Sequence, residues 1–305
     1  MPIKLELFNI IHETYLKCFQ LLASPPYHRN LGDPKSFGSG FVLMYHGRLY
    51  FITADHVVSP DNETDFVQWG DDWICGIPIG INDEENHASV CLPLTGRIEF
   101  VKGNIVSEDN LEFPEPIDLA FSNVDTKILK CKSLGFNIYP SIFCFSAGEN
   151  KKCFEESNII NPEEYENSNY FIIGSIVRIN ENSQEASLDH KLHYNLKFKE
   201  IDGENIVLES TSIIDRKKDW AGLSGSPVVN EEGKLLGMLI KAADGYNNVI
   251  VMPIETIIFK INQIERLHQI GHNINDPFII VGPGVTMDMV KNSAVVKEII
   301  SKIKK

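Results

Sequence analysis

The sequence predicts an all-β core of two six-stranded antiparallel β-barrels, with added helices at the N-terminal and C-terminal ends. Three observations predict this architecture. Short runs of strand-forming residues recur along most of the chain, polar turns separate them, and they fall into two similar blocks. The 305 residues are enough for such a double core with terminal additions, and 43% of them are hydrophobic, as is ordinary for a globular protein.

The chain opens with a segment of helical periodicity. Apolar residues recur at helical spacing over residues 3 to 23, and Pro25-Pro26 would end the helix. We expect this helix to pack across the back of the main domain, and docking of a partner protein is the alternative.

The first block of strands carries a histidine and an aspartate. Residues 37–45 and 49–53 predict a hairpin whose second strand runs into a single helical turn bearing His56. Asp118 begins a later apolar strand, and a buried carboxylate needs a partner such as the imidazole N–H of His56. Other strands of this block are expected at 66–69, 73–79 and 96–101.

The second block carries a serine between glycines. Polar, acidic residues 146–169 are expected to form a linker or a long surface loop before it. Strands then follow at 170–178, 193–198, 205–209, 227–229, 235–240 and 249–253. Ser224 lies in the turn Gly222-Leu223-Ser224-Gly225, which would expose a hydroxyl beside free backbone N–H groups, as nucleophilic catalysis requires. A plain Gly/Ser-rich turn is the alternative for this segment alone.

Two helices are predicted after the last strand, over residues 254–269 and from about residue 287 onward, with a loop at 271–284 between them. They either pack on the body or dock a regulatory partner. The expected division is an N-terminal helix and linker (1–35), a first barrel with His56 and Asp118 (36–150), a second barrel with Ser224 (151–253) and C-terminal helices (254–305).

Composition excludes several classes of function. The formal net charge of −14 would repel a phosphate backbone, so nucleic acid is not an expected partner. No apolar run is long enough to span a membrane, and no signal peptide is recognised, so a cytoplasmic location is expected. The six cysteines show neither C-x-x-C nor zinc spacing, which predicts reduced thiols and no metal, and no cofactor is implied.

Three sequence blocks together resemble the trypsin-like (chymotrypsin-fold) serine peptidases, in particular their intracellular or bacterial branch. The blocks are residues 38–42 with 51–58, residues 117–120 and residues 222–229, and they cover about 36–253 of the chain. The resemblance implies that His56, Asp118 and Ser224 form a catalytic triad in the order His, Asp, Ser. It also implies that the N–H groups of Gly222 and Ser224 form the oxyanion hole.

Several residues depart from the pattern of that family. Asp55 stands where alanine is usual, and we expect it to face solvent. Leu223 replaces the aspartate that pairs with a newly cut N-terminus, so activation by N-terminal cleavage is not expected. Ser226 replaces a glycine, and Ile240 replaces a serine that supports the triad aspartate.

The resemblance also places a specificity pocket. Lys218 would lie at its floor, and Ile240, Lys241 and Ala242 would form its wall. A lysine at the floor would disfavour a cationic substrate side chain and would favour an acidic one. A solvated charged loop is the alternative for the segment around Lys218.

The function predicted from these residues is a serine endopeptidase that cleaves a protein or peptide substrate through an acyl-enzyme, with a regulatory or bacterial defence role suggested by the resemblance. The alternative is a catalytically inactive barrel that serves as a protein-binding module. A hydrolase of another fold would need a parallel α/β sheet, which the short antiparallel strands do not favour.

Overall fold

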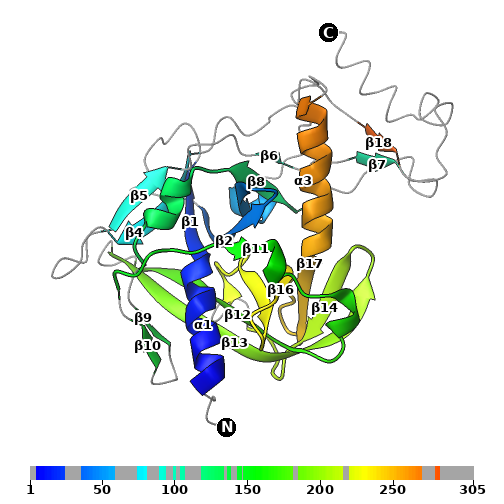
Figure 1. Cartoon of the computed structure of the whole chain (residues 1–305). Helices are drawn as coiled ribbons and strands as arrows, with labels where there is room; N and C mark the ends of the chain where they lie inside the picture. The colour runs from blue at the N-terminus through cyan, green and yellow to red at the C-terminus, as the bar shows by residue number, and fades with distance from the viewer. Residues whose placement is uncertain are drawn as a thin grey trace.

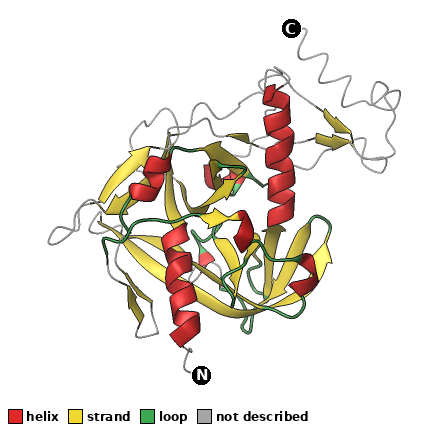
Figure 2. Ribbon diagram, in the orientation of Figure 1, coloured by secondary structure: helices red, strands yellow, loops and turns green. Residues whose placement is uncertain are grey.

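The protein is mostly β, and helices lie near both ends of the described chain (Figures 1 and 2). The computed structural model describes residues 5–24, 36–58, 74–80, 89–93, 99–100, 104–106, 118–133, 136–138, 143–145, 147–180, 185–215, 220–269 and 279–281. The strand predicted at 66–69 and the helix predicted from residue 287 lie outside these residues.

Six strands of the second half close into an antiparallel barrel. Its pairing order is β12-β13-β14-β17-β16-β15. The strands are β12 (Asn169–Asn180), β13 (Glu185–Asp202), β14 (Asn205–Glu209), β15 (Pro227–Asn230), β16 (Leu235–Ala242) and β17 (Asn248–Pro253). Alternate apolar side chains from these strands, such as Ile172, Leu208, Leu236 and Val251, are buried together inside the barrel. The second predicted barrel is therefore confirmed.

The strands of the first half form an eight-stranded sheet that is open within the described residues. Its order is β5-β4-β1-β2-β3-β8-β6, and β11 pairs in parallel with β2 outside this path. The strands are β1 (Cys18–Ser24), β2 (Ser36–Tyr45), β3 (Arg48–Thr53), β4 (Ile74–Gly80), β5 (Ser89–Pro93), β6 (Glu99–Phe100), β8 (Ala120–Asn123) and β11 (Phe154–Glu155). Because the described edge strands β5 and β6 lie at opposite ends of the order and do not pair, the prediction of two closed barrels is confirmed for one of them only.

The helix predicted over residues 3 to 23 is shorter than expected. Helix α1 (Leu5–Lys17) ends at Lys17, and β1 follows at once and pairs antiparallel with β2 from Cys18↔Phe41 to Ala23↔Ser36. Phe19 and Leu21 are fully buried, at the alternate spacing of a strand. The prediction was wrong for residues 18–23, because this apolar run fits both periods and the pairing with β2 and β4 decides for the strand.

The segment 146–169, expected as a linker or surface loop, is described from residue 147 onward and is fixed on the body there. It contains β11 and two short 3₁₀ helices, η2 (Glu156–Asn158) and η3 (Pro162–Glu164). The N–H of Lys152 donates to Leu16 O at 2.9 Å, and Phe154 is fully buried. Lys151 is buried as well, and its ammonium donates to Tyr15 O and Cys18 O at the end of α1. Burial lowers the pKa of Lys151 to about 8.

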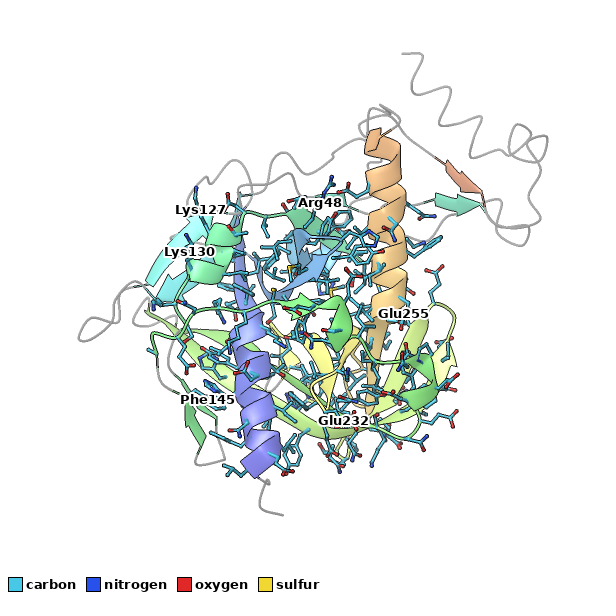
Figure 3. All side chains as sticks on the ribbon, in the orientation of Figure 1. Arg48, Lys127, Lys130, Phe145, Glu232 and Glu255 are labelled. Carbon is cyan, nitrogen blue, oxygen red and sulfur yellow. The ribbon has the colours of Figure 1, made fainter. Side chains whose placement is uncertain are left out.

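Helix α3 (Ile254–Gln269) forms as predicted and bridges the two halves. Its buried residues Ile254, Ile257 and Ile261 belong to the main core. On the side of the open sheet, Glu265 accepts hydrogen bonds from Arg48 and Tyr50 of β3. On the side of the barrel, Glu255 accepts one from Tyr165 at 2.9 Å. Figure 3 shows Arg48 to the side of α3 and Glu255 on the lower part of the helix itself.

The remaining elements are short. They are helix η1 (Thr126–Lys130), the antiparallel pair β9 (Phe136–Ile138) and β10 (Phe143–Phe145), and the parallel pair β7 (Asn104–Val106) and β18 (Ile279–Val281). Strand β18 falls where the sequence predicts a loop. It acquires its strand character from the pairing with a segment about 175 residues away, which local sequence does not encode.

Two further sequence predictions concern thiols and membranes. Cys18, Cys131 and Cys153 are free thiols in the structure, as expected of reduced cysteines. The side chains of the other three cysteines lie outside the described residues. None of the helices in the described part of the chain combines the length and the apolar character that a bilayer crossing requires.

The buried imidazole of His190 makes stability depend on pH. Burial lowers its pKa to about 4, and its Nδ1 is 2.7 Å from Ser175 Oγ. The unfolded chain takes up this proton near pH 6.5 and the folded chain does not, so its contribution to stability is complete above pH 6.5 and is lost as the pH falls towards 4. We expect His190→Gln to reduce this loss by up to roughly 3 kcal/mol.

Urea unfolding at pH 7, 6, 5 and 4.5 measures the effect. His46→Gln is the matched control, because His46 is exposed in the β2–β3 turn. Wild type and His190→Gln curves that run parallel to each other over this range would contradict the assignment.

Candidate active site

His56 is placed by the hairpin that the sequence predicts. Strands β2 and β3 pair antiparallel, and His46 and Gly47 turn the chain with φ of 48° and 73°. Strand β3 ends at Thr53, and the one-turn helix α2 (Asp55–Val58) follows. Val57 and Val58, the last two residues of this helix, are buried. The turn is thereby anchored, and the imidazole of His56 is left one-third exposed.

Asp118 lies two residues before β8, the strand that pairs with β3. Its Oδ2 is 2.8 Å from His56 Nδ1, and its Oδ1 accepts the backbone N–H of His56 at 3.1 Å. One carboxylate thus contacts both the ring and the backbone of the same residue. In the tautomer of the neutral ring whose Nδ1–H donates to Asp118, Nε2 is the nitrogen that can accept a hydrogen bond.

Asp55 differs from its expected position. From the sequence we expect its side chain to face solvent, whereas in the structure that side chain is buried, with 3% exposed. The reason is that Asp55 begins α2 beneath the end of β3, so the short turn carries His56 outward and its predecessor inward.

Ser224 lies in a turn held by two glycines of positive φ, 91° at Gly222 and 88° at Gly225. In the described part of the chain its hydroxyl donates to Ile240 O, at 3.3 Å, and makes no hydrogen bond to His56. The structure therefore brings His56 and Asp118 into contact, and it leaves the serine hydroxyl on a carbonyl of β16.

The backbone of the serine turn is joined to the strand that leads to the histidine. Ser39 N donates to Ser224 O at 2.8 Å, and Thr53 Oγ1 donates to Ser39 O at 2.7 Å. Gly225 packs so closely here that a Cβ on it would lie 1.9 Å from Ser39 O and 2.7 Å from Thr53 Oγ1. Since Thr53 is three residues before His56, the serine turn and the histidine turn are neighbours in space.

Two backbone N–H groups of the serine turn have no hydrogen-bond acceptor among the described residues. Among the described residues, the N–H of neither Gly222 nor Ser224 donates to another backbone group. The intervening Leu223 donates to Trp220 O at 3.1 Å and is fully buried in the barrel core. A buried apolar side chain thus anchors the turn between these two N–H groups.

The predicted specificity pocket is described in part. Lys218 lies outside the described residues. Ile240, Lys241 and Ala242 form the end of β16, where they are half-buried, exposed and buried respectively. Trp220, four residues before Ser224, is buried and stacks on His193 with ring centroids 3.7 Å apart.

Sequence reasoning assigned no role to Ser39, Thr53 or the Trp220–His193 stack. Ser39 could have been noticed, because it lies between two glycines at the start of the histidine block. The contact of Trp220 with His193 joins residues of different strands, and no local pattern signals it. Within the described residues, no group of three or more His, Cys, Asp or Glu side chains could hold a metal ion.

Comparison with known proteins adds little to this geometry. No family model matches the sequence, and no curated protein matches it. Among solved structures, that of Deg5 is similar over 85% of this chain and 95% of its own, with 16% identity and a TM-score of 0.41. At that TM-score the likeness decides neither the fold nor the function.

Replacement of Gly225 tests the close contact between the serine turn and β2. Gly225→Ala combines a positive φ with a clash against backbone, and we expect it to lower the free energy of unfolding by about 3 kcal/mol or more. Gly245→Ala is the matched control, because Gly245 has φ of 77° and nothing within 4 Å of a Cβ. The control is expected to lose about 1 kcal/mol.

Urea denaturation of both variants measures the difference. Equal losses in the two variants would mean that Gly225 is needed for its φ alone and that the turn does not press on β2.

Proposed function

We propose that the protein is a trypsin-like serine endopeptidase that acts through His56, Asp118 and Ser224, with the two-barrel core and the four-part division expected from the sequence. The observation that carries the proposal is the 2.8 Å contact between His56 Nδ1 and Asp118 Oδ2. Both residues lie next to strands of the open sheet, and the turn bearing Ser224 is hydrogen-bonded to β2 of that sheet. A protein or peptide is the proposed substrate, and the cytoplasmic location, the defence role and a partner for the terminal helices stay predictions.

The proposed reaction begins with rotation of the Ser224 side chain. The hydroxyl leaves Ile240 O and turns to His56 Nε2, which takes its proton as Oγ attacks the carbonyl carbon of the substrate. Asp118 holds the ring in the required tautomer and stabilises the imidazolium. The imidazolium then gives the proton to the leaving amine, and water releases the acyl group by the same steps.

The cost of this rotation is small. The bond from Ser224 Oγ to Ile240 O is 3.3 Å long, beyond the usual range of O–H···O bonds. A neutral hydrogen bond contributes about 1 kcal/mol net, so its loss is easily offset by a new bond to the imidazole.

The unpaired N–H groups support an oxyanion hole. A developing negative charge needs donors that no other group occupies, and the N–H groups of Gly222 and Ser224 meet this condition within the described residues. We propose that these two groups bind the oxyanion. Leu223 would hold the turn in this form by its burial, which removes the need for a cut N-terminus.

One observation favours a second candidate. The hydroxyl of Ser224 is hydrogen-bonded to Ile240 O and not to His56. If this bond persists with substrate present, the protein is a barrel-based binding module without peptidase activity.

Labelling with a fluorophosphonate probe separates the two functions. We expect one label per chain on wild type at Ser224, and none on Ser224→Ala, because the probe reacts only with an activated serine. Intact-mass spectrometry and peptide mapping measure this. A label that survives Ser224→Ala, or a wild type that never reacts, would exclude the peptidase and leave the binding module.

Asp118→Asn tests the role of the carboxylate. An amide donates to Nδ1 and so favours the wrong tautomer of His56, and we expect labelling to slow by roughly 10³ to 10⁴-fold. Asp125→Asn is the control, since Asp125 is exposed and caps η1 seven residues further on. Similar labelling rates for the two variants would remove Asp118 from the mechanism.

A further inference from the structure

Ser39 is a buried residue of β2 that contacts the serine turn through both its backbone and its side chain. It is fully buried. Its N–H donates to Ser224 O at 2.8 Å, and its hydroxyl donates to Gly222 O at 3.0 Å, across 183 residues of sequence. Its own carbonyl accepts the hydroxyl of Thr53 at 2.7 Å. Among the described residues of the open sheet, Ser39 alone donates hydrogen bonds to two carbonyls of this turn.

The two carbonyls that Ser39 binds belong to peptide planes whose N–H groups are also bonded. In the plane after Gly222, the N–H of Leu223 donates to Trp220 O at 3.1 Å. In the plane after Ser224, the N–H of Gly225 donates to Leu239 O at 2.8 Å. Each plane is therefore fixed at both ends, on one side by the barrel and on the other by Ser39.

The plane between these two carries the N–H of Ser224, one of the two proposed oxyanion donors. Its carbonyl, on Leu223, accepts from Ser226 N at 2.9 Å. A peptide unit is planar and rotates only through the φ and ψ angles at its ends, so fixing both neighbouring planes restricts its orientation. Without the hydroxyl of Ser39, the plane after Gly222 would lose one of its two bonds beside a glycine, which tolerates both signs of φ.

We propose that Ser39 is a positioning residue for the oxyanion hole: its hydroxyl fixes the Gly222 carbonyl, and this orients the N–H groups of Gly222 and Ser224 toward the developing charge. The inference rests on the proposed function and assigns that site a further residue. Ser39 touches no reacting atom itself, so its effect is on the transition state through the turn.

The backbone and side-chain bonds of Ser39 are separable. Any residue at position 39 supplies the N–H that binds Ser224 O, whereas only a hydroxyl at this place reaches Gly222 O. Space for it is provided by Gly174 of β12, where a Cβ would lie 3.2 Å from Ser39 Oγ. Ser39→Ala therefore removes one bond of the turn and leaves the other in place.

The experiment compares Ser39→Ala with Ser122→Ala by the kinetics of fluorophosphonate labelling. Ser122 is also buried in β8 of the same sheet, and among the described residues its hydroxyl donates to the carbonyl of the adjacent Asn123 alone. We expect kinact to fall tenfold or more in Ser39→Ala with KI little changed, because loss of a whole oxyanion donor costs about 10² to 10³. We expect kinact of Ser122→Ala to stay near that of wild type.

Thermal unfolding of both variants identifies a merely structural effect. If Ser39→Ala loses stability and retains the kinact of wild type, Ser39 only supports the fold and the inference is overturned. If wild type itself is not labelled, the proposed function fails and the inference with it. If wild type is labelled and kinact of Ser39→Ala equals that of wild type, the inference about Ser39 is wrong and the proposed function stands.

A second pair of variants serves if Ser39→Ala does not fold. Ser39→Thr and Ser39→Val have the same shape and crowd the site equally, but only threonine has a hydroxyl. We expect kinact of the threonine variant to exceed that of the valine variant tenfold or more. Equal values in the two variants would contradict a role for the hydroxyl.

Discussion

The site depends on one junction, the set of hydrogen bonds between β2 and the turn of Ser224. His56 and Asp118 lie next to strands of the open sheet, and Ser224 lies just before β15 of the closed barrel. Within the described residues, the strands of the sheet pair with one another and so do those of the barrel, so other contacts hold the two parts of the site together. Ser39 forms the junction through its N–H and its hydroxyl, and Gly225 allows the backbone to approach. A movement of 1 Å between the two sheets would lengthen these bonds beyond hydrogen-bonding distance.

The rest of the molecule restrains that movement. Helix α3 is hydrogen-bonded through Glu265 to β3 and through Glu255 to Tyr165 near the barrel. On another side, the segment around Lys151 binds the end of α1. Hydrophobic burial across the joint is continuous, since the main core includes Phe51 of the sheet and Phe171 of the barrel. Burial supplies most of the stabilisation, and the polar contacts fix one relative placement of the two halves.

The sequence predicted local structure correctly where a short pattern specifies a turn. A hairpin that ends in Thr-Ala-Asp-His, and a serine between glycines before an apolar strand, were enough to place His56 and Ser224 on turns. The prediction was wrong where pairing with neighbouring strands decides between helix and strand. Residues 18–23 form a strand because β2 and β4 pair with them on either side, and a short apolar run fits the helical and the strand period equally well.

Side-chain placement was harder to predict than element type. Asp55 and His56 are adjacent, and the direction in which the first turn of a helix leaves a strand decides which of them is buried. The hydroxyl of Ser39 gains its role from a carbonyl 183 residues away. Such contacts follow from the packing of two sheets, which local sequence restricts only weakly.

The hydroxyl of Ser224 occupies a position that the irregular pairing of β16 creates. It lies on the carbonyl of Ile240, and the register of β16 against β17 shifts between Leu239 and Lys241, so Ile240 is passed over in the pairing. A carbonyl left out of a ladder still needs a donor, and Ser224 is the donor in the described structure. Within the described residues this single bond of 3.3 Å holds the Ser224 hydroxyl, so little free energy is lost when the side chain rotates away from Ile240 O.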